Sequence, residues 1–160
     1  MKEIIGIAEM KISSRPGDLL ITYALGSCLG ITIYDAEAQV GGMLHAMLPD
    51  SSVNPSKAVK NPMMFVDTGV PELFKACYKA GAQRERLTLK VVGGASLQAP
   101  GSDDQFQIGK RNFLMLRKLL WKNNILIKAC DVGENHSRTM SLDIATGDVF
   151  LKINNQERKL

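Results

Sequence analysis

Cys28 has neighbours that suit nucleophilic chemistry. It stands in the segment Gly26-Ser27-Cys28-Leu29-Gly30, between two predicted strands. Glycines on both sides permit a tight, exposed backbone and the close approach of a substrate. A cysteine nucleophile also needs a base and donors for a developing oxyanion, and the backbone N–H groups of a Gly-Ser-Cys turn are candidate donors. The alternative interpretation is a small buried cysteine at a strand bend.

His45 is the candidate base, and Thr22 is the candidate residue that orients it. His45 lies in an apolar, strand-like segment in which Met43 and Met47 share its face. An imidazole there can draw the proton from Cys28, although a histidine in such a strand is also typical of a satisfied core residue. Thr22 lies six residues before Cys28, and its hydroxyl could complete a triad. Strand propensity alone is the other explanation for this threonine.

The cysteine pattern argues against metal sites and disulfide scaffolds. The chain has three cysteines, an odd number, and no Cys-x-x-Cys pair. Zinc-ribbon and thioredoxin-type sites are therefore not favoured, and free thiols in a reducing, cytoplasmic compartment are expected. Cys77 falls on a helical stripe and Cys130 in a strand interior, so both are expected in the core. His136 is expected on the surface of a loop.

Charge and hydropathy argue against a nucleic-acid binder, a secreted protein and a membrane protein. The net charge is +4 and the pI is near 9.0, but aromatic residues make up only 6% of the chain. A nucleic-acid binder would show a basic stripe with interleaved aromatics. The first residues contain no long apolar stretch of the signal-peptide type, and no apolar run approaches the roughly 18–20 residues of a membrane helix. We therefore expect no nucleic-acid partner and no membrane insertion.

Hydrophobic patterning predicts a mixture of strands and helices in one domain, residues 1–160. Helices are expected at 63–79, capped by Asn61 with Pro62 at its first position, and at 108–122. Pro71 should kink or split the first helix, and Gly81 should end it. The order of strands, helix, strand, helix and strands predicts an α+β fold with a mixed sheet. The remaining expected elements are strands at 4–7, 19–23, 31–35, 40–48, 87–92 and 125–130, a hairpin over 139–153, a turn at 15–18, and exposed loops at 51–61 and 99–105.

Several ordered motifs together resemble the CheD family of bacterial chemoreceptor glutamine deamidases. The likeness extends over roughly residues 3–152. Its blocks are Thr22-Tyr23-Ala24-Leu25-Gly26-Ser27-Cys28, Gly41-Gly42-Met43-Leu44-His45-Ala46-Met47-Leu48-Pro49-Asp50, Lys90-Val91-Val92-Gly93-Gly94-Ala95-Ser96, Ile108-Gly109-Lys110-Arg111-Asn112, Asp131-Val132-Gly133-Glu134-Asn135-His136-Ser137-Arg138 and Thr146-Gly147. The resemblance implies a layered sandwich of mixed sheets flanked by helices, like the cysteine-hydrolase fold of deamidating bacterial toxins.

The resemblance also implies a reaction and roles for individual residues. Glutamine side chains on the cytoplasmic helices of methyl-accepting chemotaxis receptors would become glutamate, with release of ammonia. Cys28 would be the nucleophile, His45 the base and Thr22 the residue that orients it. A thioester would form and be hydrolysed without metal or cofactor. The expected substrate-binding residues are Gly26, Ser27, Gly94 and Ser96. For Gly94 and Ser96 the alternative is a simple turn that ends the preceding strand.

A second function and one departure from the family pattern accompany this resemblance. The alternative is a mainly non-catalytic regulatory partner of a CheC-type phosphatase that acts on a response regulator. The start of the second helix, at Gly109, Arg111 and Asn112, is expected either to hold a polar loop or a partner carboxylate, or to serve only in capping and internal bracing. The family tends to have a Gly-Gly pair where this chain has Gly133 and Glu134.

Overall fold

The computed structural model describes residues 1–97 and 106–160 and contains two five-stranded sheets. In strand order, sheet A consists of β1 (Lys2–Ile4), β3 (Leu19–Leu25), β8 (Arg138–Asp143), β9 (Val149–Ile153) and β10 (Gln156–Lys159). Sheet B consists of β2 (Glu9–Ser13), β5 (Val40–Ala46), β4 (Leu29–Asp35), β6 (Leu87–Gly93) and β7 (Ile127–Val132). Both sheets are mixed, because β1 runs parallel to β3 and β6 runs parallel to β7.

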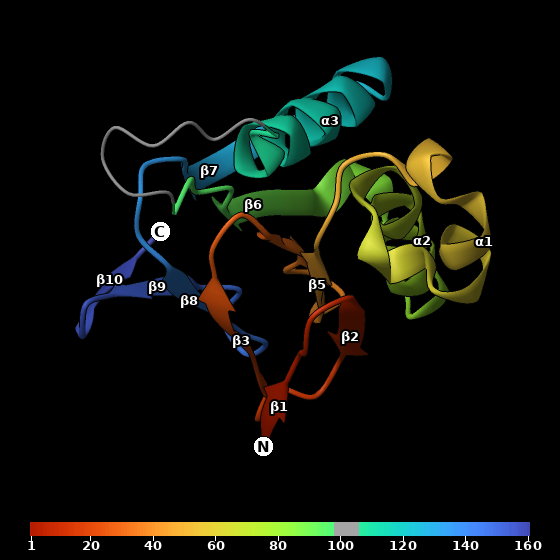
Figure 1. Cartoon of the computed structure of the whole chain (residues 1–160). Coiled ribbons are helices and arrows are strands. Elements are labelled where there is room, and N and C mark those ends of the chain that lie inside the picture. Colours follow the sequence, from red (N-terminus) through yellow and green to blue (C-terminus); the bar gives the residue numbers. More distant parts are fainter. Residues whose placement is uncertain (98–105) are drawn as a thin grey trace.

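The helices complete a layered α+β arrangement, as expected from the sequence (Figure 1). The helices of the described residues are α1 (Pro55–Lys60), α2 (Val66–Lys79) and α3 (Ile108–Lys122). Short 3-10 helices are η1 (Ser51–Val53), η2 (Pro62–Met64) and η3 (Arg84–Arg86). Apolar residues of α2 and α3 pack with those of β4 and β5 in one core cluster, so these helices cover one face of sheet B. Among the helices of the described residues, none is long and apolar enough to cross a membrane.

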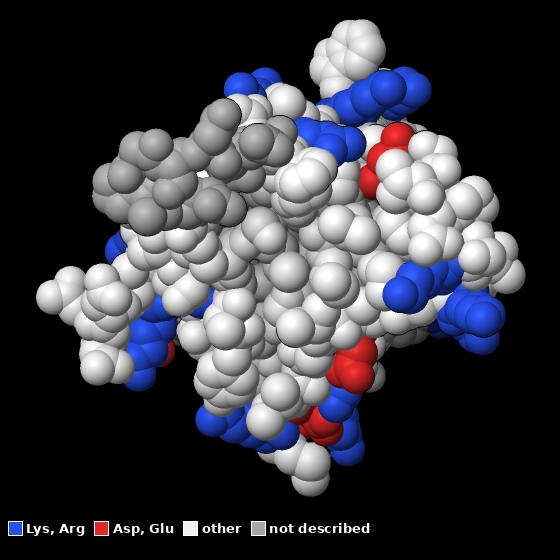
Figure 2. All heavy atoms as spheres, viewed as in Figure 1, with Lys and Arg blue, Asp and Glu red and all other residues white. Residues whose placement is uncertain are grey.

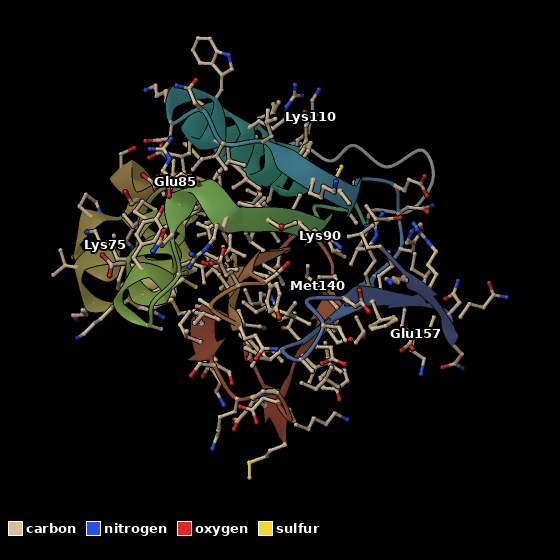
Figure 3. The ribbon with its side chains drawn as sticks, turned by 180° about the vertical axis from the view of Figure 1, so that it is seen from behind. Lys75, Glu85, Lys90, Lys110, Met140 and Glu157 are labelled. Carbon is tan, nitrogen blue, oxygen red and sulfur yellow. The ribbon has the colours of Figure 1, made fainter. Side chains whose placement is uncertain are left out.

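Side chains on β4 alternate between two cores. Leu29, Ile31 and Ile33 pack beneath the helices, whereas Tyr34 belongs to the core that lies between the two sheets. Met140 of β8 is fully buried in this second core and lies in the middle of the molecule seen from behind (Figure 3). This alternation agrees with the strand predicted at 31–35, and it leaves the residues that face sheet A available for a site between the sheets.

The long elements agree with the sequence predictions. The helix at 108–122 and the strands within β3, β4, β5 and β6 are confirmed, and so is the hairpin of β8 and β9. The predicted strand at 125–130 is shifted to Ile127–Val132, and the one at 4–7 is replaced by Lys2–Ile4. Gly81, with φ +111°, follows the end of α2 as predicted. The predicted connection at 99–105 lies outside the described residues.

The structure corrects the loop predicted before α2, and it excludes one of the two alternatives predicted for Pro71, a split of the helix. Residues 51–61 form η1 and α1 rather than only a loop, because the Asn54 side chain accepts a hydrogen bond from the Lys57 N–H and Pro55 occupies the first helical position. Pro71 does not split the helix, since α2 runs unbroken from Val66 to Lys79. Its buried stripe on sheet B stabilises the helix, although proline cannot donate a backbone hydrogen bond.

Cys130 is a third correction. The sequence predicts it in the core, but its side chain is exposed. It lies on β7, the edge strand of sheet B, where exposed and half-buried residues alternate. Cys77 is buried between α2 and sheet B, as predicted.

Candidate active site

Thr22 and His45 meet between the two sheets. Thr22 lies on β3 of sheet A and His45 on β5 of sheet B, and both are almost completely buried. The Thr22 Oγ1 and His45 Nδ1 atoms are 2.7 Å apart. The same hydroxyl donates a hydrogen bond to the Ile5 carbonyl oxygen, also at 2.7 Å. Thr22 and His45, which the sequence predicts as partners, are thus in contact although they belong to different sheets.

This chain of hydrogen bonds selects one form of the neutral imidazole. A threonine hydroxyl has one hydrogen, and the Ile5 carbonyl can only accept it. Oγ1 must therefore accept the hydrogen of His45 Nδ1, which leaves Nε2 as the unprotonated nitrogen of the neutral ring. Nε2 is buried and has no hydrogen-bond partner among the described residues. The nitrogen required of a general base is thus the one that carries a free lone pair.

Cys28 enters the same region through the register of β4 and β5. Gly30 of β4 lies directly opposite His45, and Cys28 precedes Gly30 by two residues. Cys28 immediately precedes β4, and an extension of this register by one residue places it diagonally across from His45. Within residues 1–97 and 106–160, no hydrogen bond joins Cys28 to His45 Nε2. Such contacts are often long in a free enzyme and tighten when the substrate binds.

The turn that carries Cys28 is held by the end of β6. The Gly94 N–H donates to the Cys28 carbonyl, and the Ala95 N–H donates to the Gly26 carbonyl, both at 2.9 Å. Gly93 has φ +119°, and a Cβ built on it would lie 2.2 Å from the Cys28 carbonyl oxygen. The glycine therefore permits a backbone contact that no other residue type could make.

Burial tunes the ionisation of both candidate groups. It raises the pKa of the Cys28 thiol, and the backbone N–H of Cys28 acts in the opposite direction. Burial also lowers the pKa of the His45 imidazole, while the Glu9 carboxylate opposes this change. Both shifts favour the neutral forms. At neutral pH these directions favour an uncharged thiol and an uncharged imidazole over a charged pair.

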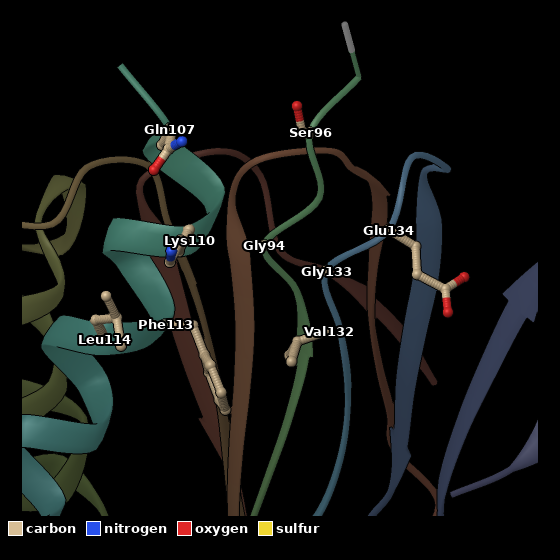
Figure 4. A pocket seen from close by; sticks show the side chains of 9 residues that line it. All are labelled: Gly94, Ser96, Gln107, Lys110, Phe113, Leu114, Val132, Gly133 and Glu134. Carbon is tan, nitrogen blue, oxygen red and sulfur yellow. The ribbon is translucent and has the colours of Figure 1, made fainter. Parts of the chain in front are cut away.

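Gly94 and Ser96 border a hollow beside this turn (Figure 4). The hollow has a volume of about 440 Å³, and Cys28 is not part of its lining. Phe113 and Val132 line it from opposite sides, whereas the Glu134 side chain points away from α3. Ser96 is tied to this region by its N–H, which donates to the Glu134 carbonyl at 2.9 Å. The four expected substrate-binding residues thus lie in the Cys28 turn or in the segment attached to it.

The remaining candidates lie elsewhere or have other partners. His136 is in the loop before β8, half-buried and near the Glu134 carboxylate. Arg111 is exposed on α3. The sequence did not identify the Ile5 carbonyl, and no residue-type signal could, because every residue has a backbone carbonyl. No group of three or more metal-ligating side chains occurs in the described part of the chain.

Uncharged residues cover the surface in front of the β3–β4 turn. Figure 2 shows this face, with Lys, Arg, Asp and Glu gathered around its border and white atoms in its middle. The half-buried Cys28 in this turn is the most accessible of the three candidate catalytic residues, because Thr22 and His45 are almost completely buried.

Comparisons with known proteins identify the family. The family model for CheD, described as "CheD chemotactic sensory transduction", matches residues 47–153. "Probable chemoreceptor glutamine deamidase CheD 1" of Syntrophus aciditrophicus is 52% identical over 151 residues, which cover 93% of this chain and 92% of that protein. "Probable chemoreceptor glutamine deamidase CheD" of Solibacter usitatus is 46% identical over 98% of this chain and 92% of its own length. The chain therefore belongs to the CheD family of chemotactic sensory transduction proteins.

Proposed function

We propose that this chain is a cysteine-dependent chemoreceptor glutamine deamidase. The observation that carries the proposal is the hydrogen-bond chain from His45 through Thr22 to the Ile5 carbonyl. It leaves Nε2 unprotonated and, among the described residues, without a hydrogen-bond partner. The names of the relatives from Syntrophus and Solibacter support glutamine side chains of chemoreceptors as the substrate.

The first half of the reaction forms a thioester. The Cys28 thiol gives its proton to His45 Nε2 as Sγ bonds to the amide carbon of the glutamine side chain. The amide oxygen takes the negative charge, which backbone N–H groups of the Gly26-Ser27-Cys28 turn would stabilise. The C–N bond then breaks, and the nitrogen leaves as ammonia with the proton held on Nε2.

The second half releases glutamate. A water molecule gives a proton to Nε2 as its oxygen bonds to the thioester carbon, and the C–S bond breaks. Sγ recovers the proton from His45, so the site returns to its neutral state. The net reaction consumes one amide and one water and yields one carboxylic acid and one ammonia, which exchange a proton in water to give carboxylate and ammonium. No step requires a metal or an organic cofactor.

The uncharged state of Cys28 and His45 determines how His45 acts as the base. Because burial favours the uncharged thiol and the uncharged imidazole, Cys28 is activated by proton transfer during the attack rather than by a standing thiolate–imidazolium pair. Thr22 keeps Nδ1 protonated throughout the cycle. The uncharged surface around the turn suits the approach of a neutral amide (Figure 2).

The test is conversion of a receptor fragment by the wild-type chain and by the Cys28→Ala and His45→Ala variants, followed by mass spectrometry of its glutamine-containing peptides. We expect amide-to-acid conversion by wild type only. Cys130→Ala is the matched control, since it removes an exposed thiol far from the triad in sequence, and it should retain activity. Conversion by folded Cys28→Ala would contradict the proposed mechanism.

The proposal includes a cytoplasmic location and receptor helices as partners. A CheC-type phosphatase is a further proposed partner, which rests on the family resemblance alone. The inactive Cys28→Ala variant separates the two roles. The regulatory alternative would be favoured by two results together. Cys28→Ala would stimulate the phosphatase as strongly as wild type does, and wild type would leave the receptor glutamines unaltered.

A further inference from the structure

Asn112 joins the two segments that carry the candidate nucleophile and the candidate base. Its Nδ2 donates one hydrogen bond to the Ser27 carbonyl and another to the Met47 carbonyl, both at 2.9 Å. Ser27 immediately precedes Cys28, and Met47 follows His45 by two residues. The Asn112 side chain is completely buried. Both hydrogens of one amide group thus bind backbone on either side of the site.

We propose that Asn112 is a positioning residue that directs the backbone N–H of Cys28 toward the oxyanion of the reaction. This inference rests on the proposed deamidase function. It assigns Asn112 no contact with the substrate, because the side chain acts through the peptide unit between Ser27 and Cys28.

The direction of the Cys28 N–H follows from the planar geometry of that peptide unit. In a trans peptide, the carbonyl and the N–H point in opposite directions, and no peptide bond of the described residues is cis. Because Asn112 holds the Ser27 carbonyl on its own side, the Cys28 N–H must point away from α3. That N–H lies close to the Cys28 sulfur, which it influences as a hydrogen-bond donor. In residues 1–97 and 106–160, no backbone carbonyl or side chain outside Cys28 accepts a hydrogen bond from it.

The first turn of α3 is placed for this role by Gly109. A Cβ on Gly109 would lie 2.4 Å from the Ala95 carbonyl oxygen and 2.5 Å from that of Gly94. The N–H groups of these two residues hold the Cys28 turn. Gly109 therefore lets the helix approach this segment closely, and Asn112, one turn later, reaches the Ser27 carbonyl.

The unpaired oxygen of Asn112 argues against a role in packing alone. Asn112 Oδ1 is buried and has no partner among the described residues. An apolar side chain of similar size would fill the space without leaving an unsatisfied acceptor, but it could not bind the two carbonyls. An asparagine at this position therefore buries an unpaired acceptor at a cost in free energy, and its two Nδ2 hydrogen bonds are what it offers in return.

The experiment compares two reactions of the Cys28 thiol in the Asn112→Ala variant, in a Cys130→Ser background that removes the exposed thiol. Acylation by p-nitrophenyl acetate develops an oxyanion, whereas alkylation by iodoacetamide does not. We expect the acylation rate and the kcat for a receptor fragment to fall about 10²-fold, as they do when one oxyanion donor is lost. The alkylation rate and the KM should stay near wild type. Asn123→Ala, at the exposed end of the same helix, is the control variant and should change none of these rates.

Each outcome has a defined meaning. Equal losses of acylation and alkylation in a folded variant would show that Asn112 only braces the fold, and wild-type rates for both would show that it is dispensable. Either result overturns the inference. Should Asn112→Ala fail to fold, Asn112→Ser, which retains one donor, replaces it, and unfolding of both variants would also overturn it. If wild type acylates at Cys28 but leaves receptor glutamines unchanged, the proposed function fails while the role of Asn112 is still measured by acylation.

Discussion

Gly30 lies directly opposite His45 in the antiparallel ladder of β4 and β5, so no side chain of β4 competes with the imidazole. A Cβ on Gly30 would come within 2.8 Å of Leu25 Cδ1 and of Met140 Sδ, which both belong to sheet A. The missing side chain therefore allows sheet A to close over this part of sheet B. That closure brings the Thr22 hydroxyl to His45 Nδ1.

Gly30→Ala should destabilise the protein and weaken the triad. The added methyl group overpacks the core between the sheets, and we expect the free energy of unfolding in urea to fall by about 1–3 kcal/mol. Deamidation should also slow, because relief of the clash moves β3 away from β5. Gly17→Ala is the control, since a Cβ there meets nothing within 4 Å. Equal stability of Gly30→Ala and wild type would show that the two sheets are not closely fitted at this point.

Thr22→Val should lower kcat while the protein stays folded. Valine has the shape of threonine but cannot accept the Nδ1 hydrogen, so His45 loses the contact that selects its tautomer. We expect a loss on the order of 10²-fold in kcat, the lower part of the range for general base catalysis. Thr22→Ser retains a hydroxyl and should recover most of the rate. If Thr22→Val and Thr22→Ser have the same kcat, the hydroxyl does not orient the base.

The dependence of kcat/KM on pH should reflect the neutral resting pair. Activity requires an uncharged His45, whose pKa burial lowers, so the rate should rise with pH through an apparent pKa below the ordinary histidine value of about 6.5. The rate should stay high until the Cys28 thiol ionises. Burial raises the pKa of this thiol, so that limit lies above the ordinary thiol range. A pH–rate profile with the receptor fragment measures both limits. A rate that rises only near pH ~8.5, the ordinary thiol range, would instead indicate that a free thiolate is required.

The sequence could predict much of the fold where the periodic patterns are strong. Helix α3 begins and ends at the predicted residues, because Met115, Leu116, Leu119 and Leu120 recur at helical spacing and pack on sheet B. Strand β2 has a usable signal, since Met10 and Ile12 alternate with polar residues, but it was not predicted. Strand β10 has no signal, because all four of its residues are polar and exposed. Its pairing with β9 is a property of the assembled sheet.

The residues of the candidate site could be identified from motifs, but not their contacts. Thr22 and His45 lie on different sheets, and local patterning does not determine how two sheets face each other. The Ile5 carbonyl and the Asn112 contacts depend on the same tertiary arrangement. Cys130 illustrates the opposite failure, because an apolar-looking strand pattern does not reveal that β7 is an edge strand. Glu134, with φ +58°, adopts the left-handed conformation at the position where the family tends to have glycine.

The three thiols should react with a disulfide reagent in a fixed order. Cys130 is exposed and should react first, and Cys130→Ser should remove this fast phase. Cys28 is half-buried with a raised pKa and should react more slowly. Burial raises the pKa of Cys77 to about 12, so its thiol should react only when the protein unfolds. Rapid labelling of Cys77 in the folded protein would contradict the packing of α2 on sheet B.

The stability of the protein should decrease below pH ~6.5 because of His45. The folded protein holds this imidazole in its neutral form, with a pKa below that of the unfolded chain. As the pH falls through the unfolded value, the unfolded state binds a proton that the folded state does not, and the free energy of unfolding declines until His45 protonates in the folded protein as well. Urea unfolding between pH 7 and pH ~4.5 should show this slope, since carboxyl groups titrate mainly below that range. His45→Gln cannot take up the proton and should flatten the curve. An unchanged slope in His45→Gln would assign the pH dependence to another group and would contradict the buried, neutral imidazole on which the proposed reaction depends.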